Sequence, residues 1–501
     1  MRQCENPHSF GSIGHDLGLL LQVPGAMAFL SLVIVIGSEE WSMLPGFLLT
    51  GVLGIGSGQV LYRRCQAKGP TAPSQAMIIV ALGWLLIVLL GAVPLFVAAH
   101  LESDLSESGR VFRHPLNALF ESMSGFTSTG LTMTHDPSTL PMSLQWWRTF
   151  SEWIGGIGVM VLALALFDPT EKHDSLYSAE TRSTHLGDSI KETAVRIWTI
   201  FFAYTLFAMG AFYVSGMPIW ESINHGMTGI ATGGFTITSN SFRDYNVTIK
   251  SAAIMIMLLG AINFVTHHAL LVRRTPSFVM GQSQFRALIL LYALGTIFLI
   301  TVEVSRYIPT AFIDRVFQWT SALGTCGFST VQLTNWTQPA LLILTLGMFI
   351  GGMSGSTTGG LKLNRVVWLW KAVRWRIETF WLGDGQSARY HYDGEEIADG
   401  HAMRQVGFAA ILAFLYVMTL VMGPLLFFMI LGDRYSLSEI LFETASALGS
   451  VGLSVGITSP DLPAAAKGAV ITLMWMGRLE IIAVIILLTR PFVKLFKRRL
   501  A

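Results

Sequence analysis

Four ten-residue segments of the chain repeat one pattern of hydroxyl, small and apolar residues around a glycine. They read MSGFTSTGLT at 123–132, MTGIATGGFT at 227–236, TSALGTCGFS at 320–329 and ASALGSVGLS at 445–454. Backbone carbonyl oxygens can replace the hydration shell of a cation, and aiming consecutive carbonyls at one axis needs backbone angles that glycine permits. Four such segments in register therefore predict four like loops around a common axis, lining a path for cations.

Each segment contributes its glycine and three neighbours to a predicted ion-binding filter. The hydroxyl at the first of these positions could supply an oxygen ligand or brace the loop, whereas the thiol of Cys326 is expected to be packed and inert. Alternatively, the glycines are helix C-caps or close-packing sites, as small residues in membrane proteins often are. Four copies in register favour the filter. Its predicted residues are Ser128, Thr129, Gly130, Leu131, Thr232, Gly233, Gly234, Phe235, Thr325, Cys326, Gly327, Phe328, Ser450, Val451, Gly452 and Leu453.

A second unusual stretch, residues 351–360, carries five glycines and several hydroxyl residues in the middle of an apolar run. Such a composition cannot hold a stable helix. We predict an intramembrane loop below the filter that blocks or opens the path, with a flexible kink packed against small neighbours as the alternative. The predicted gate residues are Gly351, Gly352, Ser354, Gly355, Ser356, Thr357, Thr358, Gly359, Gly360 and Arg478.

Arg478 lies in the otherwise apolar run 471–488, where Glu480 is the only other charged residue. A charge inside a membrane is costly and generally faces a cavity or a partner. Residues two positions apart do not share a helix face, which argues against a local ion pair between Arg478 and Glu480. Two interpretations remain: a structural pairing with a carbonyl of another helix, or a positive charge near the path that repels cations and docks the 351–360 loop.

Two further acidic residues, Glu152 and Glu443, lie next to the predicted pore segments. An ionisable group within a membrane generally needs partners there. For both residues we favour hydrogen bonds at helix ends or between helices over direct coordination of an ion.

The elements that must position these residues are membrane-spanning helices. Hydrophobic residues make up 52% of the chain and charged residues only 13%, against about 25% charged in soluble proteins. Apolar runs of about 20 residues, the length of a membrane-spanning helix, recur along the chain. We predict an all-α polytopic membrane protein with about ten transmembrane helices, at 17–37, 45–62, 76–99, 142–167, 194–215, 249–272, 285–304, 338–371, 404–431 and 466–489.

The last eight predicted spans form four pairs, and a shorter segment that ends in the repeated pattern lies within each pair. These segments are roughly 115–127, 218–231, 311–324 and 436–448, and each is too short to span. A re-entrant half-helix followed by an extended loop fits this length, provided that protein or a water-filled cavity surrounds the irregular backbone. The prediction is four re-entrant pore half-helices in a pseudo-four-fold arrangement.

The repeats divide the chain into an N-terminal region and four pore units. The expected division is 1–70 for two transmembrane helices outside the repeat, 71–180 for unit 1, 181–276 for unit 2, 277–380 for unit 3 with its interrupted second helix, and 381–501 for a cytosolic linker, unit 4 and a basic C-terminus. With the N-terminus inside, 23 Lys and Arg residues fall on inner segments and 9 on outer ones. This bias has the sign of the positive-inside rule. It places both termini in the cytosol and all four repeated loops on the outer side.

Together, these residues resemble the Trk/Ktr/HKT superfamily of potassium transporters. The four helix–half-helix–helix units, each with one filter glycine, carry the likeness, and the two extra N-terminal spans are similar to the bacterial TrkH-type branch. The stretch GGMSGSTTGGLK at 351–362 resembles the family's interruption in the second helix of unit 3. The stretch MGRLE at 476–480 resembles its arginine motif in unit 4. The likeness covers residues 76–489.

The resemblance implies potassium uptake across the cytoplasmic (inner) membrane through a channel-like pore, with potassium as the transported ion bound at the filter residues. It also implies a homodimer surrounded by membrane lipid, and a cytosolic nucleotide-binding regulatory subunit of the TrkA type. No nucleic acid partner is expected. The three cysteines lie far apart, without metal-ligand spacing.

Other functions are disfavoured by the sequence. A secondary transporter with a midplane site usually has inverted or two-fold repeats with two broken helices, whereas the repeats here are four, parallel and on one side. An ion-coupled transporter that uses the same pore, driven by sodium or protons, stays open as the alternative. The sequence lacks a zinc-binding HExxH motif, a nucleophile elbow and a phosphate-binding Walker motif, so we expect neither an enzyme nor a cofactor in this chain.

Overall fold

The computed structural model describes residues 9–65, 73–166, 190–302, 310–381 and 389–499. Within these ranges the regular elements are helices, apart from one short antiparallel hairpin of β1 (His391–Tyr392) and β2 (Glu395–Glu396). Two of the expected unit boundaries, at 70/71 and 180/181, lie outside the described residues.

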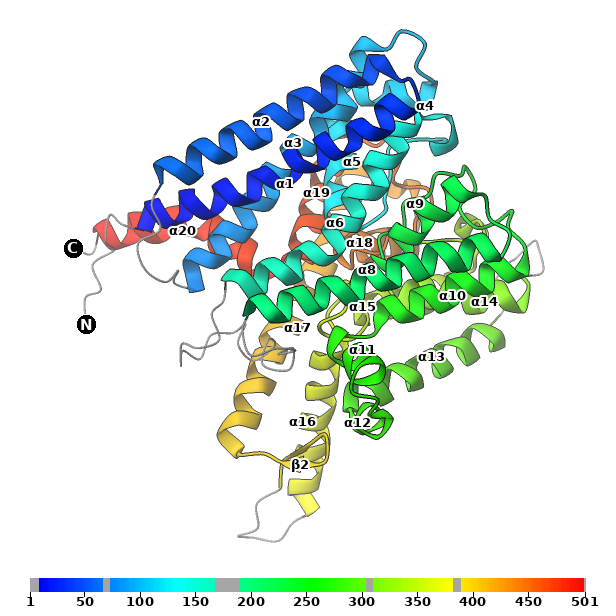
Figure 1. Ribbon diagram of the computed structural model, residues 1–501. Coiled ribbons are helices and arrows are strands. Elements are labelled where there is room, and N and C mark those ends of the chain that lie inside the picture. The colour runs from blue at the N-terminus through cyan, green and yellow to red at the C-terminus, as the bar shows by residue number, and fades with distance from the viewer. Residues whose placement is uncertain (1–8, 66–72, 167–189, 303–309, 382–388, 500–501) are drawn as a thin grey trace.

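The two N-terminal helices, α1 (Ser9–Gly37) and α2 (Leu44–Arg64), form an antiparallel pair along one side of the molecule (Figure 1). Glycines allow their backbones to approach closely: a Cβ added at Gly54 would lie 2.9 Å from the Cα of Gly25. The link between the two helices docks on the repeat through Glu40, whose carboxylate accepts hydrogen bonds from the backbone N–H of Met142 at 2.6 Å and of Ser143 at 2.9 Å. The pair is thereby fixed to the start of a helix of unit 1.

The remainder of the chain repeats one arrangement four times: a first helix, a half-helix of 12 residues and a second helix. Unit 1 has α3 (Pro73–Leu101), α5 (Pro115–Phe126) and α6 (Met142–Leu166). Unit 2 has α8 (Ile190–Val214), α9 (Ile219–Ile230) and α10 (Val247–Ala261) followed by α11 (Phe264–Leu271). Unit 3 has α13 (Ser283–Thr301), α14 (Phe312–Leu323) and α15 (Gln338–Ile350) followed by α16 (Leu363–Trp381). Unit 4 has α17 (Asp399–Leu431), α18 (Leu437–Leu448) and α19 (Ala464–Arg478) followed by α20 (Ile481–Arg499).

The four units close into a ring. The second helix of each unit packs against the half-helix of the next: α6 on α9, α10 on α14, α15 on α18 and, closing the circle, α19 on α5. The half-helices are buried along most of their length, so the irregular backbone that follows them is surrounded by protein. The predicted pseudo-four-fold arrangement of re-entrant half-helices is confirmed.

Six helices of the described residues are long and apolar enough to cross a membrane, and two bent pairs raise this number to eight. The bends are 106° between α10 and α11 and 113° between α19 and α20. The predicted spans at 249–272 and 466–489 therefore correspond to bent pairs of helices and not to single straight helices. At the first bend the side chain of Asn263 caps the new helix by accepting from the N–H of Thr266 at 2.7 Å. At the second, Glu480 takes a left-handed conformation with φ 62°, which ends the preceding helix.

The other two predicted spans contain functional features. Helix α6 carries Arg148 and Glu152 in its body, and the run 338–371 is interrupted between α15 and α16, as the glycine-rich composition predicts.

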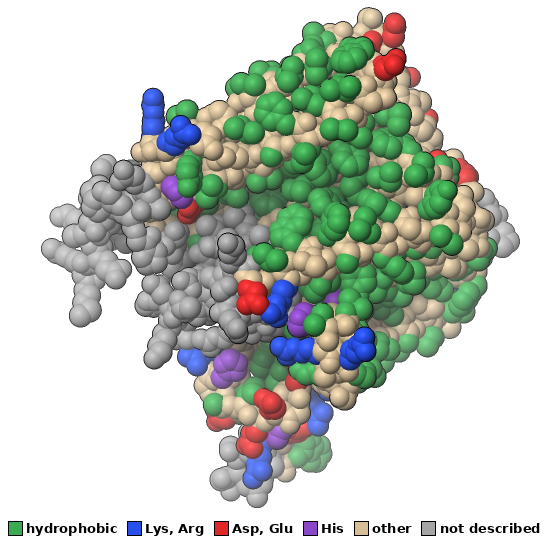
Figure 2. All heavy atoms as spheres, viewed as in Figure 1, with side chains coloured by type: hydrophobic (Ala, Val, Ile, Leu, Met, Phe, Trp, Pro, Cys, Tyr) green, Lys and Arg blue, Asp and Glu red, His purple; other side chains and the backbone are tan. Residues whose placement is uncertain are grey.

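Figure 2 shows hydrophobic side chains over the middle of one face and charged side chains gathered toward its ends. Helices α16 and α17 extend beyond the body of the molecule, with the β-hairpin between them (Figure 1).

Candidate ion pathway

The four half-helices end in the same hydrogen-bonded cap, a Schellman motif. In unit 1 the N–H of Thr129 donates to the carbonyl of Ser124 at 2.9 Å, and the N–H of Ser128 donates to Gly125 at 2.8 Å. The equivalent bonds from Gly233 to Thr228, Cys326 to Ser321 and Val451 to Ser446 are also 2.9 Å long. In each cap the left-handed residue is a hydroxyl residue: Ser128, Thr232, Thr325 and Ser450 have φ of 48°, 49°, 45° and 51°. The aligned glycines, two positions later, are thus not the helix caps.

After each cap comes a short loop, which we name loop 1 (128–131), loop 2 (232–235), loop 3 (325–328) and loop 4 (450–453). Their glycines also have positive φ: 88° at Gly130, 93° at Gly234, 90° at Gly327 and 94° at Gly452. L-amino acids with a side chain rarely adopt such a conformation. The repeated sequence pattern thus corresponds to one repeated backbone conformation.

The four glycines face the neighbouring loops in cyclic order. A Cβ at Gly130 would lie 2.4 Å from the carbonyl oxygen of Gly233 in loop 2. The corresponding distances are 2.4 Å from Gly234 to Cys326, 2.2 Å from Gly327 to Val451 and 2.1 Å from Gly452 to Thr129. Each loop therefore abuts the carbonyl of the next, and loop 4 returns to loop 1. The ring of loops has no room for a side chain at any of the four positions.

The other loop residues are buried. Leu131, Phe235, Phe328 and Leu453 are at most 1% exposed, and Thr129, Cys326 and Val451 are fully buried. The thiol of Cys326 lies 4.0 Å from the carbonyl oxygen of Gly229 and is one of the free cysteines of the described residues. These contacts fit the expectation of a packed thiol.

Three of the four hydroxyls brace their loops. Ser128 donates to the carbonyl of Glu152 at 2.8 Å, Thr232 donates to the hydroxyl of Thr357 at 3.2 Å, and the Thr325 hydroxyl accepts from the N–H of Gly359 at 2.8 Å. The Ser450 hydroxyl is buried without a partner among the described residues. Of the two roles considered for these hydroxyls, bracing is therefore the one visible in units 1 to 3.

A second group of residues also braces the loops, and the sequence analysis did not recognise them as equivalent positions of the four units. The residue nine positions before each aligned glycine is polar and buried: Glu121, His225, Gln318 and Glu443. Each bonds the chain that leaves its loop. Three of them accept a hydrogen bond from a backbone N–H: Glu121 from Met133 at 2.7 Å, His225 from Ile237 at 3.3 Å and Glu443 from Val455 at 3.1 Å. The fourth, Gln318, donates to the hydroxyl of Ser329 at 2.9 Å. The constant spacing from the glycine was the signal that could have found them.

The carboxylate of Glu152 supports loop 2 from the neighbouring unit. Its two oxygens accept from the N–H of Phe235 at 3.1 and 2.9 Å. Glu443 accepts in addition from the Ser454 hydroxyl at 2.8 Å and the N–H of Thr458 at 3.0 Å. Both acidic residues are thus hydrogen-bonded, but their partners lie in loops rather than at the helix ends or on the other helices that the sequence analysis favoured.

The loop that interrupts unit 3, residues 351–362, lies against the ends of the half-helices. The Thr357 hydroxyl donates to the carbonyl of Ile230 at 3.1 Å and to that of Gly260 at 3.0 Å. The N–H of Gly360 donates to the carbonyl of Gly449 at 3.0 Å. Together with the bond from Gly359 to Thr325, these contacts join the interrupting loop to units 2, 3 and 4.

The remaining predicted gate residues anchor the same loop. Gly351, Gly355 and Gly360 have positive φ, Met353 and Ser354 donate their N–H groups to Ala261 and to the side chain of Gln284, and the hydroxyls of Ser356 and Thr358 lie 2.7 Å apart. A Cβ at Gly352 would lie 2.7 Å from the Thr358 hydroxyl. The structure therefore brings these residues together in one compact, hydrogen-bonded loop.

Arg478 reaches this loop from unit 4. Its guanidinium donates to the carbonyl of Thr357 at 3.0 Å and to those of Gly155 and Gly156 at 2.6 Å each. Arg478 thus binds carbonyls of another helix, as the first interpretation expects, and also docks the loop, which is one part of the second. Glu480 forms an ion pair with Arg365, the third residue of α16.

Among the described residues, no group of His, Cys, Asp and Glu side chains could hold a metal ion. A sequence profile of TrkH, described as a cation transport protein, matches residues 44–497. The chain belongs to the TrkH family of cation transport proteins. The resemblance drawn from the repeats is thus confirmed.

Individual relatives match over nearly their whole length. An uncharacterized cation transporter of Methanocaldococcus jannaschii is 31% identical over 96% of this chain and 95% of its own. The Trk system potassium uptake protein TrkG of Escherichia coli is 26% identical, over 96% and 98% of the two chains. The crystal structure of the potassium transporter TrkH from Vibrio parahaemolyticus superposes with a TM-score of 0.82 at 25% identity, over 96% of this chain and 99% of that one. The fold is therefore that of a TrkH-type membrane transporter.

Proposed function

We propose that this protein takes up potassium through a channel-like pore lined by the four loops. The observation that carries the proposal is the closed ring in which each aligned glycine abuts a carbonyl of the next loop. The relatives named as potassium uptake proteins support potassium as the transported ion.

The loop carbonyls are the proposed ligands of the ion. Each loop has left-handed residues at its first and third positions, such as Ser128 and Gly130. In an ordinary extended chain, successive carbonyls point to opposite sides; an alternating left-handed conformation can turn them to the same side. Four loops then offer rings of uncharged oxygens that replace the hydration shell without holding the ion too tightly. The negative ends of the half-helices point the same way and favour a cation.

The interrupting loop, residues 351–360, and Arg478 are the proposed gate. Their contacts support this role because the loop bonds the ends of two half-helices and Arg478 ties it to α6. A loop rich in glycine can rearrange at low cost, and release of the three carbonyl bonds of Arg478 would free it to move. The positive charge of Arg478 also opposes the passage of a cation nearby.

The surroundings of the pore follow from the same proposal. The chain would lie in the cytoplasmic (inner) membrane with both termini in the cytosol, contact membrane lipid and act as a homodimer without nucleic acid. A cytosolic nucleotide-binding subunit of the TrkA type would regulate it, since the relatives are named as parts of Trk systems. We also retain the division into an N-terminal region, 1–70, and four pore units.

The test is a bi-ionic reversal potential with purified protein in a planar bilayer, with K⁺ on one side and Na⁺ on the other. Because K⁺ is expected to be more permeant than Na⁺, we expect a reversal potential at which the K⁺ side is negative relative to the Na⁺ side. A parallel ⁸⁶Rb⁺ uptake assay in liposomes uses a variant lacking residues 354–358, so that a closed gate does not hide the pore. If this variant assembles and carries neither Rb⁺ nor K⁺, the proposed function fails. A flux that requires a sodium or proton gradient would instead support the coupled transporter.

A further inference from the structure

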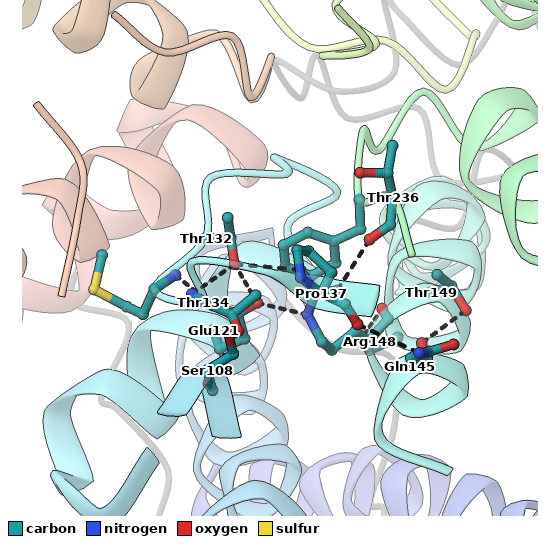
Figure 3. A network of polar contacts seen from close by, with 12 residues as sticks. Ser108, Glu121, Thr132, Thr134, Pro137, Gln145, Arg148, Thr149 and Thr236 are labelled. Atoms are coloured by element: carbon teal, nitrogen blue, oxygen red, sulfur yellow. Dashed lines mark hydrogen bonds and ion pairs between the residues drawn. The ribbon is translucent and has the colours of Figure 1, made fainter. Parts of the chain in front are cut away.

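Arg148 is a buried cation of α6 that neither the filter nor the gate described above includes. Its side chain is 1% exposed, and it contacts residues at the ends of two different loops. Figure 3 shows Arg148 between Glu121 and Thr132 on one side and Thr236 on the other. Glu121 and Thr132 belong to unit 1, whereas Thr236 directly follows loop 2.

On the unit 1 side, Arg148 completes a closed set of charge-assisted bonds. Its Nε donates to Glu121 Oε1 at 2.6 Å, and its NH2 group donates to the Thr132 hydroxyl at 3.2 Å. The Thr132 hydroxyl donates in turn to Glu121 at 2.7 Å, and the other oxygen of Glu121 holds the N–H of Met133. The guanidinium therefore fixes the carboxylate that fixes the outer end of loop 1.

On the unit 2 side, the same guanidinium holds loop 2. Its NH1 group donates to the carbonyl of Thr236 at 3.2 Å, and its Cζ atom lies 4.1 Å from the centre of the Phe235 ring. Phe235 is the last residue of loop 2, and its N–H is bonded to Glu152. A planar group with five donors can make bonds in several fixed directions and stack on a ring at once, which an ammonium group cannot do.

These contacts lead us to propose that Arg148 is a positioning residue for ion selectivity. Through Glu121 and Thr132, which flank loop 1, and through Phe235 and Thr236 at the end of loop 2, it sets the distance between the two loops. Discrimination between cations of different size depends on how firmly the oxygen ligands are held. The negative charge of Glu121 balances that of Arg148, so the pair orders the loops without placing a net charge beside the ion.

Lys467 provides a matched control. It is also a cation of a second helix, is 6% exposed and joins two units, because its Nζ donates to Asn117 Oδ1 at 2.7 Å and to the carbonyl of Pro460 at 2.6 Å. Neither partner belongs to a loop of the ring. Lys467→Met therefore removes a buried charge and a contact between units but no contact with the residues that flank loops 1 and 2.

The inference rests on the proposed function and is tested in two variants. Arg148→Lys keeps the positive charge next to Glu121 but lacks the planar guanidinium that bonds residues next to both loops. The double variant Glu121→Gln/Arg148→Met removes both charges, so that no unpaired buried charge remains. The measurement is the K⁺/Na⁺ permeability ratio from bi-ionic reversal potentials, together with K⁺ flux per assembled protein. We expect the ratio to fall several-fold in both variants and to stay at the parental value in Lys467→Met.

The outcomes separate this inference from the proposed function. An assembled variant lacking residues 354–358 that carries no potassium refutes the proposed function itself. A selective parent with an unchanged ratio in the assembled Arg148 variants refutes only the role of Arg148. An equal loss of selectivity in Lys467→Met would show that any buried contact between units has this effect, and failure of both Arg148 variants to assemble would show a folding role. Either result overturns the assignment.

Discussion

Replacement of Gly234 by alanine tests the ring of loops most directly. The added Cβ would lie 2.4 Å from the carbonyl oxygen of Cys326, whereas real Cβ contacts essentially never fall below 3.0 Å. Loop 2 or loop 3 must therefore move by at least 0.6 Å along this contact. Because Gly234 has φ 93°, alanine adds backbone strain of about 1–3 kcal/mol.

The displaced group is one of the carbonyls proposed to bind the ion, so selectivity should suffer before folding does. If this strain raises the free-energy barrier for K⁺ relative to that for Na⁺ by about 1–2 kcal/mol, the K⁺/Na⁺ permeability ratio falls by a factor of about 5–30. The assay is the bi-ionic reversal potential of Gly234→Ala protein whose assembly is checked by size-exclusion chromatography. Gly210→Ala serves as the control, because a Cβ there meets nothing within 4 Å. An unchanged reversal potential in assembled Gly234→Ala protein would refute a role of this glycine in the filter.

Three other predictions concern the gate and the braces. Deletion of residues 354–358 should raise basal Rb⁺ flux while the K⁺/Na⁺ ratio stays the same; a lower ratio without higher flux would point to support of the filter instead. Arg478→Ala should increase K⁺ flux per assembled protein, since three carbonyl bonds that hold the loop are lost, and flux at or below the parental value would reject its gating role. Glu443→Ala leaves buried donors unpaired and should destabilise the protein by about 1–3 kcal/mol, visible as a lower thermal transition in detergent; Glu443→Gln should lose less, and equal transitions in all three proteins would contradict the brace.

Local composition was enough to predict the half-helices and the interruption. Each half-helix ends where a repeated pattern changes from apolar residues to hydroxyl and glycine residues, so the predicted end of 115–127 is one residue from the observed end at Phe126. The interruption between Ile350 and Leu363 follows from five glycines in one short stretch. In both cases the cause lies within the segment itself.

Features that arise between units could not be predicted in this way. The bend at Asn263 depends on the hydrogen bond by which its side chain caps the next helix. The sequence does not show that this bond forms, because an asparagine can also lie within a continuous apolar helix. Arg148 is 27 positions from Glu121 and 88 from Thr236, and only the closed ring brings the three together. The sequence names the residue types, but the packing of α6 on α9 decides which of them meet.

The closing contact of the ring has a consequence for biogenesis. Unit 4 completes the circle by packing α19 on α5, and the bond from Lys467 to Asn117 joins residues 350 positions apart. During synthesis, the side of α5 that packs against α19 therefore has no partner until almost the entire polypeptide has left the ribosome. A chain that stops before α19 retains all four re-entrant segments but leaves the ring with an open side, through which lipid or a quality-control protease can reach the unpaired backbone.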